Sequence, residues 1–447
     1  MPSAAPSRYL GVTSGIALVV SNMVGAGVLL STGFMAQDMG PDTILLAWIM
    51  GAVIALAGAR AYAQAAAWIP RSGGEYRFLS DLLHPSLGYL AGWGSLLVGF
   101  SAPIAVNALA AGAFAATLVR GLPQRPFAIA VIVLLTVVHG ARLQASKWMH
   151  NSLVALEAVL LLGFVAVGLA LGENRWPSWA PQNESAGFPV AAFAASLFYI
   201  AFAFSGWNAA AYVASDFGDP RRDVPRAMLF GCSSVAVLYL AVNWVFVANL
   251  TPAEGRAVFD YETTRVTLGH VLIKRLLGET AGAAMSALAL LALTSAASAM
   301  TVVGPRVYAA MAEDGFLPGA LRARQGRPPT GSVVLQSALA LVLVLTHSLQ
   351  QALSNVGAIL TLFAALVSCT IVRERFRPTG RSRPGHVTMV CAGVHVASTA
   401  WMLYFGLRGA THLLSWIVGL AAAGLLAYAL TRRGPGRKPS SIAPYGA

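Results

Sequence analysis

The sequence predicts an all-α polytopic membrane protein with twelve transmembrane helices, and two observations carry this prediction. Hydrophobic residues make up 57% of the 447 residues, whereas Asp, Glu, Lys and Arg together make up 11%. A soluble globular protein carries roughly 25% charged residues, so this chain lacks the polar surface that water requires. The apolar runs are also long and continuous, which fits helices of about 20 residues that cross a bilayer and argues against a β-barrel.

Apolar stretches separated by Pro, Gly or charged residues define the expected helices in order. The first begins after Tyr9 and is too long, and lacks the cleavage site, for a secretory signal. The twelve stretches lie near 11–37, 42–69, 85–119, 127–146, 149–171, 190–214, 226–249, 281–312, 331–347, 352–373, 386–407 and 411–431.

The distribution of basic residues predicts the orientation. With a cytoplasmic N-terminus, twenty of the thirty Lys and Arg residues fall on the cytoplasmic side and eight fall outside. Cytoplasmic loops are enriched in Lys and Arg, so both termini are expected in the cytoplasm and the chain in the cell membrane. This bias accounts for the net charge of +13 without nucleic acid. The basic segments 373–383 and 432–438 are expected to touch anionic lipids.

The sequence lacks the motifs that are typical of several other classes of function. Cys232, Cys369 and Cys391 lie in apolar segments without a C-x-x-C pair or a His partner, so no metal or disulfide is expected. The chain has no phosphate-binding G-x-x-x-x-G-K-[ST] and no H-E-x-x-H or G-x-S-x-G. Neither a cofactor nor an enzymatic activity is therefore expected.

Small residues cluster in the middle of two expected spans. Gly25, Ala26 and Gly27 lie in the first, and Ser205 and Gly206 lie in the sixth. Each cluster taken alone favours close helix packing, while a broken helix beside a polar cavity is the alternative. Their corresponding positions, each in the first span of a five-helix half, favour the second explanation. Interrupted helices in matching places indicate a transporter built from inverted repeats.

Four motifs then show a family resemblance over most of residues 11–378. The chain resembles the amino acid–polyamine–organocation permeases, closest in wording to the neutral L-amino acid branch. The first span is similar to the family's G-S-G-I-F, and Ile69–Tyr76 is similar to P-x-S-G-G-x-Y. The sixth span and its loop are similar to F-A-[YF]-x-G-W-N and N-P-x-R-x-x-P-R-A. Residues 304–318 resemble G-x-R-x-x-x-A-M-A-x-D-G-x-L-P.

This resemblance implies the leucine-transporter type of fold and transport by alternating access. The expected organisation is a cytoplasmic N-terminus (1–10), a first five-helix repeat (11–171), an external loop (172–189), a second, inverted repeat (190–373), helices 11 and 12 (374–431) and a cytoplasmic basic tail (432–447). Two positions depart from the family pattern. Ala26 lacks the usual hydroxyl, and Gln64 stands where Glu is usual.

The expected substrate site lies at the two breaks. A zwitterion needs donors for its carboxylate, which the half-helix beginning near Gly27 would supply, and acceptors for its ammonium, which released carbonyls would supply. The substrate-binding candidates are Val24, Gly25, Ala26, Gly27, Phe202, Ala203, Phe204, Ser205, Gly206 and Trp207. By analogy with the family, Phe202 would be the outer gate, although each aromatic residue also suits ordinary core packing.

Glu157 is the one acidic residue expected deep inside a span, where a carboxyl group costs about 2.5–3.5 kcal/mol. We interpret it as a site that couples transport to protons or holds a cation near Thr294, Ser295 and Ser298. The alternative is a neutral Glu that hydrogen-bonds to a neighbouring helix.

The loop 215–226 mixes Asp216, Asp219 and Asp223 with three arginines. An ion pair such as Asp216 with Arg221 would close an inner gate, while a solvated loop is the alternative. The prolines there are expected to start the next helix. Arg306 is expected to extend to the membrane interface.

The predicted function is secondary active transport of amino acids, with neutral L-amino acids favoured because the core spans offer no carboxylate for a cationic substrate. Polyamine or cationic amino acid transport is the alternative, and a membrane enzyme or a sensor is a more remote one. The expected partners are an amino acid, the lipid bilayer and protons. The particular amino acid, the choice between exchange and symport, the direction and the oligomeric state stay open.

Overall fold

The computed structural model describes residues 10–141, 143–177, 179–180, 187–251, 268–322, 329–376, 380–409 and 412–432. Apart from Leu10, the predicted N-terminal segment lies outside the described residues, and so does the basic tail from residue 433 onwards. The side chain of Glu157 also lies outside them, although its backbone is helical.

The chain forms helices in the following order. The first half gives α1 (Val12–Met23), α2 (Ala26–Met35), α3 (Pro41–Trp68), α4 (Glu75–Leu82), α5 (Pro85–Gly94), the π-helical turn η1 (Ser95–Phe100), α6 (Ser101–Leu118), α7 (Gln124–Ala141) and α8 (Leu143–Leu171). The rest gives α9 (Val190–Ala203), α10 (Ala209–Tyr212), the 3₁₀ turn η2 (Ala214–Asp216), α11 (Pro220–Asn249), α14 (Leu268–Leu277), α15 (Glu279–Glu313), the 3₁₀ turn η3 (Gly319–Leu321), α16 (Thr330–Thr346), α17 (Leu349–Phe376), α18 (His386–Gly409) and α19 (His412–Arg432).

Within the described residues, nine helical stretches are long and apolar enough to cross a membrane. Three shorter apolar helices, Ala158–Leu171, Val190–Ala203 and Thr330–Thr346, coincide with three further predicted spans. The prediction of an all-helical chain with many membrane-length helices is confirmed. Pro41, Pro85 and Pro220 start α3, α5 and α11, where their missing N–H has no partner to lose.

Three features depart from the simple list of spans. The first and sixth spans are each divided in two, as the small-residue clusters predict. The helices α4 and α14 were not predicted, because both are short and carry charges that resemble loop sequence. The third span contains η1, whose wider turn changes which face of the following helix points inward.

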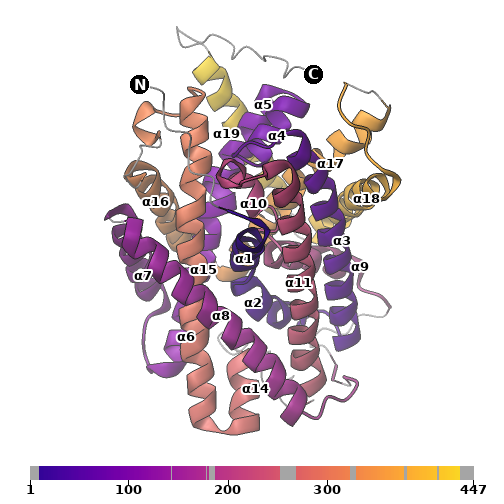
Figure 1. Ribbon diagram of the computed structural model, residues 1–447. Helices are drawn as coiled ribbons and strands as arrows, with labels where there is room; N and C mark the ends of the chain where they lie inside the picture. Colours follow the sequence, from indigo (N-terminus) through magenta and orange to yellow (C-terminus); the bar gives the residue numbers. More distant parts are fainter. Residues whose placement is uncertain are drawn as a thin grey trace.

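The helices α1 and α2 lie near the centre of the bundle, where α1 contacts α10, α11 and α15, and α2 contacts α9 and α11 (Figure 1). The helix α11 packs against α1 and α3, α15 packs against α6 and α8, and α9 packs against α17 and α18. Large apolar side chains cover the outer helices, such as Val237 at 70% exposed and Leu426 at 62% exposed. A lipid environment accounts for such a surface.

One end of the bundle collects the polar contacts between segments far apart in sequence. It is the upper end in Figure 1, where α4 and the last turns of α15 and α17 lie. We call it the basic end, because Arg71, Arg77 and Arg306 make their ion pairs there.

Candidate functional site

The first break separates α1 from α2 at Val24 and Gly25, as predicted. The backbone of Val24 is extended (φ −70°, ψ 125°), so the helix ends at Met23 and restarts at Ala26. A Cβ on Gly27 would lie 2.4 Å from Cα of Ala203. Glycine is therefore required at position 27, because the backbones of α2 and α9 touch.

The second break follows α9, which ends at Ala203, and a turn of residues 204–208 leads into α10. Gly206 has φ +106°, a conformation that side-chain-bearing residues avoid. A Cβ there would also lie 2.5 Å from the carbonyl oxygen of Asn22. The two breaks therefore pack directly against each other, and both are confirmed.

The two breaks share a polar partner on α11. The hydroxyl of Tyr239 lies 2.6 Å from the carbonyl oxygen of Met23 and 3.1 Å from that of Ala203. These are the last residues of α1 and α9, where carbonyls lose their helical donors. Tyr239 is fully buried, so one phenol fixes the spacing of both interrupted helices.

We expect Tyr239→Phe to lower the apparent melting temperature of the purified protein by several degrees. Removing a buried hydrogen-bond partner costs about 1–3 kcal/mol, and here two released carbonyls lose their shared donor. Tyr404→Phe is the matched control, because Tyr404 is 55% exposed. Equal melting temperatures for the two variants would contradict the role of Tyr239.

Asn107 of α6 is the hydrogen-bond acceptor for the N–H of Ala26, the first residue of α2. Its Oδ1 accepts the N–H of Ala26 at 2.9 Å, and its Nδ2 donates to the carbonyl of Pro103 at 2.9 Å. The second bond orients the amide so that its oxygen faces the helix end. An acceptor oxygen of the protein thus lies where the sequence predicts the carboxylate of a substrate.

A cavity lies beside the second break. Its empty space, including any part open to solvent, is about 840 Å³. The apolar lining includes Ile54, Phe100, Leu197, Met300 and Leu360. The polar lining comes from Asn22, Glu75, Asn208, Tyr212, Thr361 and His395.

The predicted substrate-binding residues divide into two groups. Phe204, Ser205, Gly206 and Trp207 line the cavity. Val24, Gly25, Ala26, Gly27, Phe202 and Ala203 are buried next to it without belonging to its lining. Trp207 packs edge-on against Tyr62, with ring centroids 4.6 Å apart.

Glu75, the first residue of α4, is the main feature that the sequence analysis missed. It is 6% exposed and lines the cavity. Its carboxyl group accepts hydrogen bonds from the hydroxyls of Tyr62 and Tyr212 and from the amide of Asn208. The expectation that the core spans offer no carboxylate for a substrate therefore does not describe the whole cavity lining. That expectation considered only the spans, whereas Glu75 enters from the connection between α3 and α5.

The predicted coupling residues lie on α15, which packs against α8, the helix of Glu157. Thr294 donates to the carbonyl of Leu290 at 2.8 Å, and the hydroxyl of Ser298 lies 2.9 Å from Nε2 of His139. Ser295 is fully buried, and its hydroxyl has no partner among the described residues. Among those residues no group of three or more His, Cys, Asp or Glu side chains could hold a metal ion.

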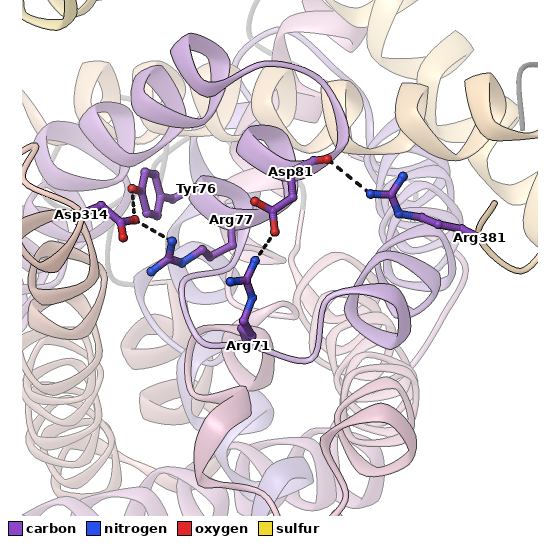
Figure 2. A network of polar contacts seen from close by, with 6 residues as sticks. All are labelled: Arg71, Tyr76, Arg77, Asp81, Asp314 and Arg381. Atoms are coloured by element: carbon purple, nitrogen blue, oxygen red, sulfur yellow. Dashed lines mark hydrogen bonds and ion pairs between the residues drawn. The ribbon is translucent and has the colours of Figure 1, made fainter. Parts of the chain in front are cut away.

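Polar contacts hold the basic end together, as Figure 2 shows. Arg77 pairs with Asp314 at 2.6 Å, and the hydroxyl of Tyr76 donates to the same carboxylate. Asp81 pairs with Arg71 through its side chain and accepts from Arg381 through its carbonyl oxygen at 3.4 Å. The helix α4 is thereby tied to the end of α15 and to the segment after α17.

Asp216 also pairs at the basic end, but with Arg306 of α15 at 2.6 Å. Within the described part of the chain, no ion pair joins two residues of the loop 215–226, including the expected Asp216 and Arg221. Reciprocal bonds of 3.0 and 3.2 Å between Ser72 and Ser215 lie beside this pair. These contacts join the loop to α15 and to the connection between α3 and α4.

We expect Asp216→Arg to slow transport a few-fold and the double variant Asp216→Arg, Arg306→Asp to recover most of the rate. The pair is partly exposed, with 27% and 40% side-chain exposure, so it contributes up to about 1 kcal/mol. Initial uptake rates of the wild type, of Asp216→Arg, of Arg306→Asp and of the double variant form a double-mutant cycle. Additive effects would show that the pair has no part in transport.

The interrupted helices, the cavity beside the second break and the apolar outer surface together describe a membrane protein with a cavity inside its bundle. The amino acid permease family model matches residues 10–430. The chain belongs to this family.

Curated relatives include several amino acid transporters. The large neutral amino acids transporter small subunit 2 of Mus musculus is 24% identical over 90% of this chain and 76% of its own length. The b(0,+)-type amino acid transporter 1 of Oryctolagus cuniculus is 28% identical over 59% of this chain and 55% of its own length. The Asc-type amino acid transporter 1 of Mus musculus is 24% identical over 60% and 52%. The chain thus spans about half the length of the last two.

Proposed function

We propose that this protein is a secondary active transporter that moves neutral L-amino acids across the cell membrane by alternating access. The observation that carries the proposal is the pair of interrupted helices packed together beside a cavity. Backbone breaks at membrane depth require protein or a polar cavity to satisfy them, and transporters use such breaks to bind charged substrates. Family membership and the named relatives support the same assignment.

The proposed architecture is two inverted five-helix repeats, 11–171 and 190–373, followed by two helices in 374–431, which makes twelve spans. The breaks lie in the first span of each proposed repeat, which supports this division. We assign the basic end to the cytoplasm, with both termini there, because basic residues favour that side.

In the proposed binding mode, the substrate carboxylate takes the place of the Asn107 oxygen at the start of α2, where the helix dipole favours negative charge. The ammonium group meets carbonyls near Val24 and between Ala203 and Ser205. A carbonyl that accepts from Tyr239 keeps a second lone pair for this purpose. The apolar lining then receives a neutral side chain, with Phe202 as the proposed outer gate.

The inner gate and the coupling site complete the proposal. Asp216 serves as a gate residue through its pair with Arg306, and Arg221 stays a gate candidate from the sequence. Glu157 with Thr294, Ser295 and Ser298 stays the candidate for coupling to protons or another cation, which the packing of α8 against α15 supports.

A second candidate function is transport of cationic amino acids or polyamines. The observation that favours it is the Glu75 carboxyl group in the cavity lining, since a carboxylate there suits a positively charged side chain.

Counterflow in proteoliposomes tests the main proposal. Vesicles loaded with an unlabelled amino acid should accumulate external labelled amino acid transiently, and protein-free vesicles should not. Leucine, arginine and cadaverine, used separately, distinguish the neutral from the cationic candidate. Absence of counterflow with all twenty amino acids and the common polyamines would exclude a carrier of either kind.

A further inference from the structure

Glu75 lies where the cavity meets the basic end. It is the first residue of α4, directly after the connection that carries Ser72. Glu75 lines the cavity, and its carboxyl group contacts Tyr62 of α3 and Tyr212 of α10. Its place is fixed by packing, because a Cβ on the preceding Gly74 would lie 2.3 Å from the Tyr212 ring.

The partners of the Glu75 carboxyl group are all neutral. The hydroxyl of Tyr62 donates to Oε1 at 3.1 Å, Asn208 donates to the same oxygen, and Tyr212 donates to Oε2. Among the described residues no Lys or Arg forms an ion pair with it. Buried carboxylates usually have a cationic partner, so this one is unusual.

Burial therefore governs the protonation of this group. Removal from water raises the pKa of the Glu75 carboxyl, and the hydrogen bonds from Tyr212, Tyr62 and Asn208 offset only part of that rise. Glu75 therefore binds a proton more tightly while the basic end is closed than it would if it were exposed to water. By linkage, opening this end to water favours loss of the proton.

Several other titratable and charged groups lie around Glu75. Tyr62 of α3 and Tyr212 of α10 contact the carboxyl group, His395 of α18 lines the cavity, and Tyr308 of α15 interacts with Tyr212. On α4 itself, Arg77 and Asp81 are paired with Asp314 and Arg71. At the far end of α4, Arg373 of α17 donates to the carbonyl of Leu82, and Glu374 is buried nearby.

Opening of the basic end would expose Glu75. Its donors Asn208 and Tyr212 belong to the segment that runs from the second break to η2. The same segment is fastened by the bonds of Ser215 to Ser72 and of Asp216 to Arg306. A movement that separates these pairs therefore also withdraws two of the three donors and admits water to the carboxyl group.

We propose that Glu75 is a proton-binding site that takes a proton from the cavity while the basic end is closed and releases it to water when that end opens. Protons then move together with the amino acid. This proposal rests on the transport function proposed above. It adds a coupling group that none of the sequence motifs assigned.

The test uses the full-length protein in proteoliposomes with an imposed pH difference. With one proton moved per substrate, a difference of one pH unit changes the accumulation ratio about tenfold. We expect this tenfold response in the wild type and no response in Glu75→Gln, which should still exchange labelled for unlabelled substrate. Glu374→Gln, another buried carboxyl near the basic end, is the matched control and should keep the response.

Each outcome decides one of the two proposals. If the wild type shows no counterflow, the transport function itself fails. If the wild type exchanges substrate but ignores the pH difference, or if Glu75→Gln keeps the response, the Glu75 proposal is wrong while the transport function stands. Loss of the response in Glu157→Gln with its retention in Glu75→Gln would assign coupling to Glu157 instead.

Tyr212→Phe covers the case in which Glu75→Gln does not fold. It removes one donor to the carboxylate and keeps Glu75, so it should move the midpoint of the pH dependence of transport to higher pH. An unchanged midpoint in a folded Tyr212→Phe protein would overturn the proposal.

Discussion

Replacing Gly206 with alanine is expected to reduce uptake at least about 100-fold, because a left-handed conformation costs other residues about 1–3 kcal/mol and overlap adds to that cost. Gly206 has φ +106°, and an added Cβ would lie 2.5 Å from the carbonyl oxygen of Asn22. Relief of the overlap requires the second break to move away from the first, which changes the cavity that the second break lines. Initial uptake rates at saturating substrate measure the loss.

Gly393→Ala is the matched control for this experiment. Gly393 lies inside α18, and a Cβ there would meet no atom within 4 Å. Alanine also suits a helix interior better than glycine, so uptake and stability should be kept. Normal uptake by Gly206→Ala would mean that the conformation of the second break does not matter for transport.

Replacing Asn107 with aspartate is expected to weaken substrate binding about 100-fold or more. Two negative charges about 4 Å apart repel by about 4 kcal/mol at an effective dielectric constant of about 20. The carboxylate introduced by Asn107→Asp would hold the N–H of Ala26, which the Asn107 oxygen now accepts at 2.9 Å, and would repel the substrate carboxylate. Binding isotherms with the best substrate from the counterflow assay measure the change in Kd.

The variant Asn107→Ala distinguishes the effect of the added negative charge from the effect of losing the Asn107 amide. It frees the N–H of Ala26 without adding charge, so its Kd should stay within about tenfold of the wild type. Equal weakening by both variants would indicate that Asn107 positions α2 and that the carboxylate binds elsewhere.

The sequence predicted the features that depend on local chemistry. Gly25, Gly27 and Gly206 are poor choices inside a membrane helix, and this local cost, together with their matching positions in the two halves, predicted both breaks. The prolines of the loop 215–226 indicated a helix start, but the predicted span began at residue 226, whereas α11 begins at Pro220. The proximity of the two breaks also followed, because matching positions in two halves predicted a shared site.

The contacts that complete the site could not be predicted in this way, because they join residues far apart in the chain. Tyr239, Asn107 and Glu75 are each separated by tens of residues from the breaks or helices they contact. A polar side chain within an apolar stretch was the available signal for Tyr239 and Asn107. Glu75 gave no such signal, because its neighbours Arg71 and Arg77 make the segment resemble an exposed loop. The partner of Arg306 could not be predicted for a similar reason, since Asp216 lies far away in the sequence.

The π-helical turn at Ser95–Phe100 amounts to one extra residue within an otherwise α-helical span. In an α-helix each residue advances the rotation by about 100°, so deleting one residue there would rotate all of α6 by that angle relative to α5. Asn107 would then leave the start of α2, and the hydrogen bond from Ser101 to Leu96 across this turn would lose its geometry. A single residue in this turn is thus enough to direct the side chain of Asn107 toward the broken helix.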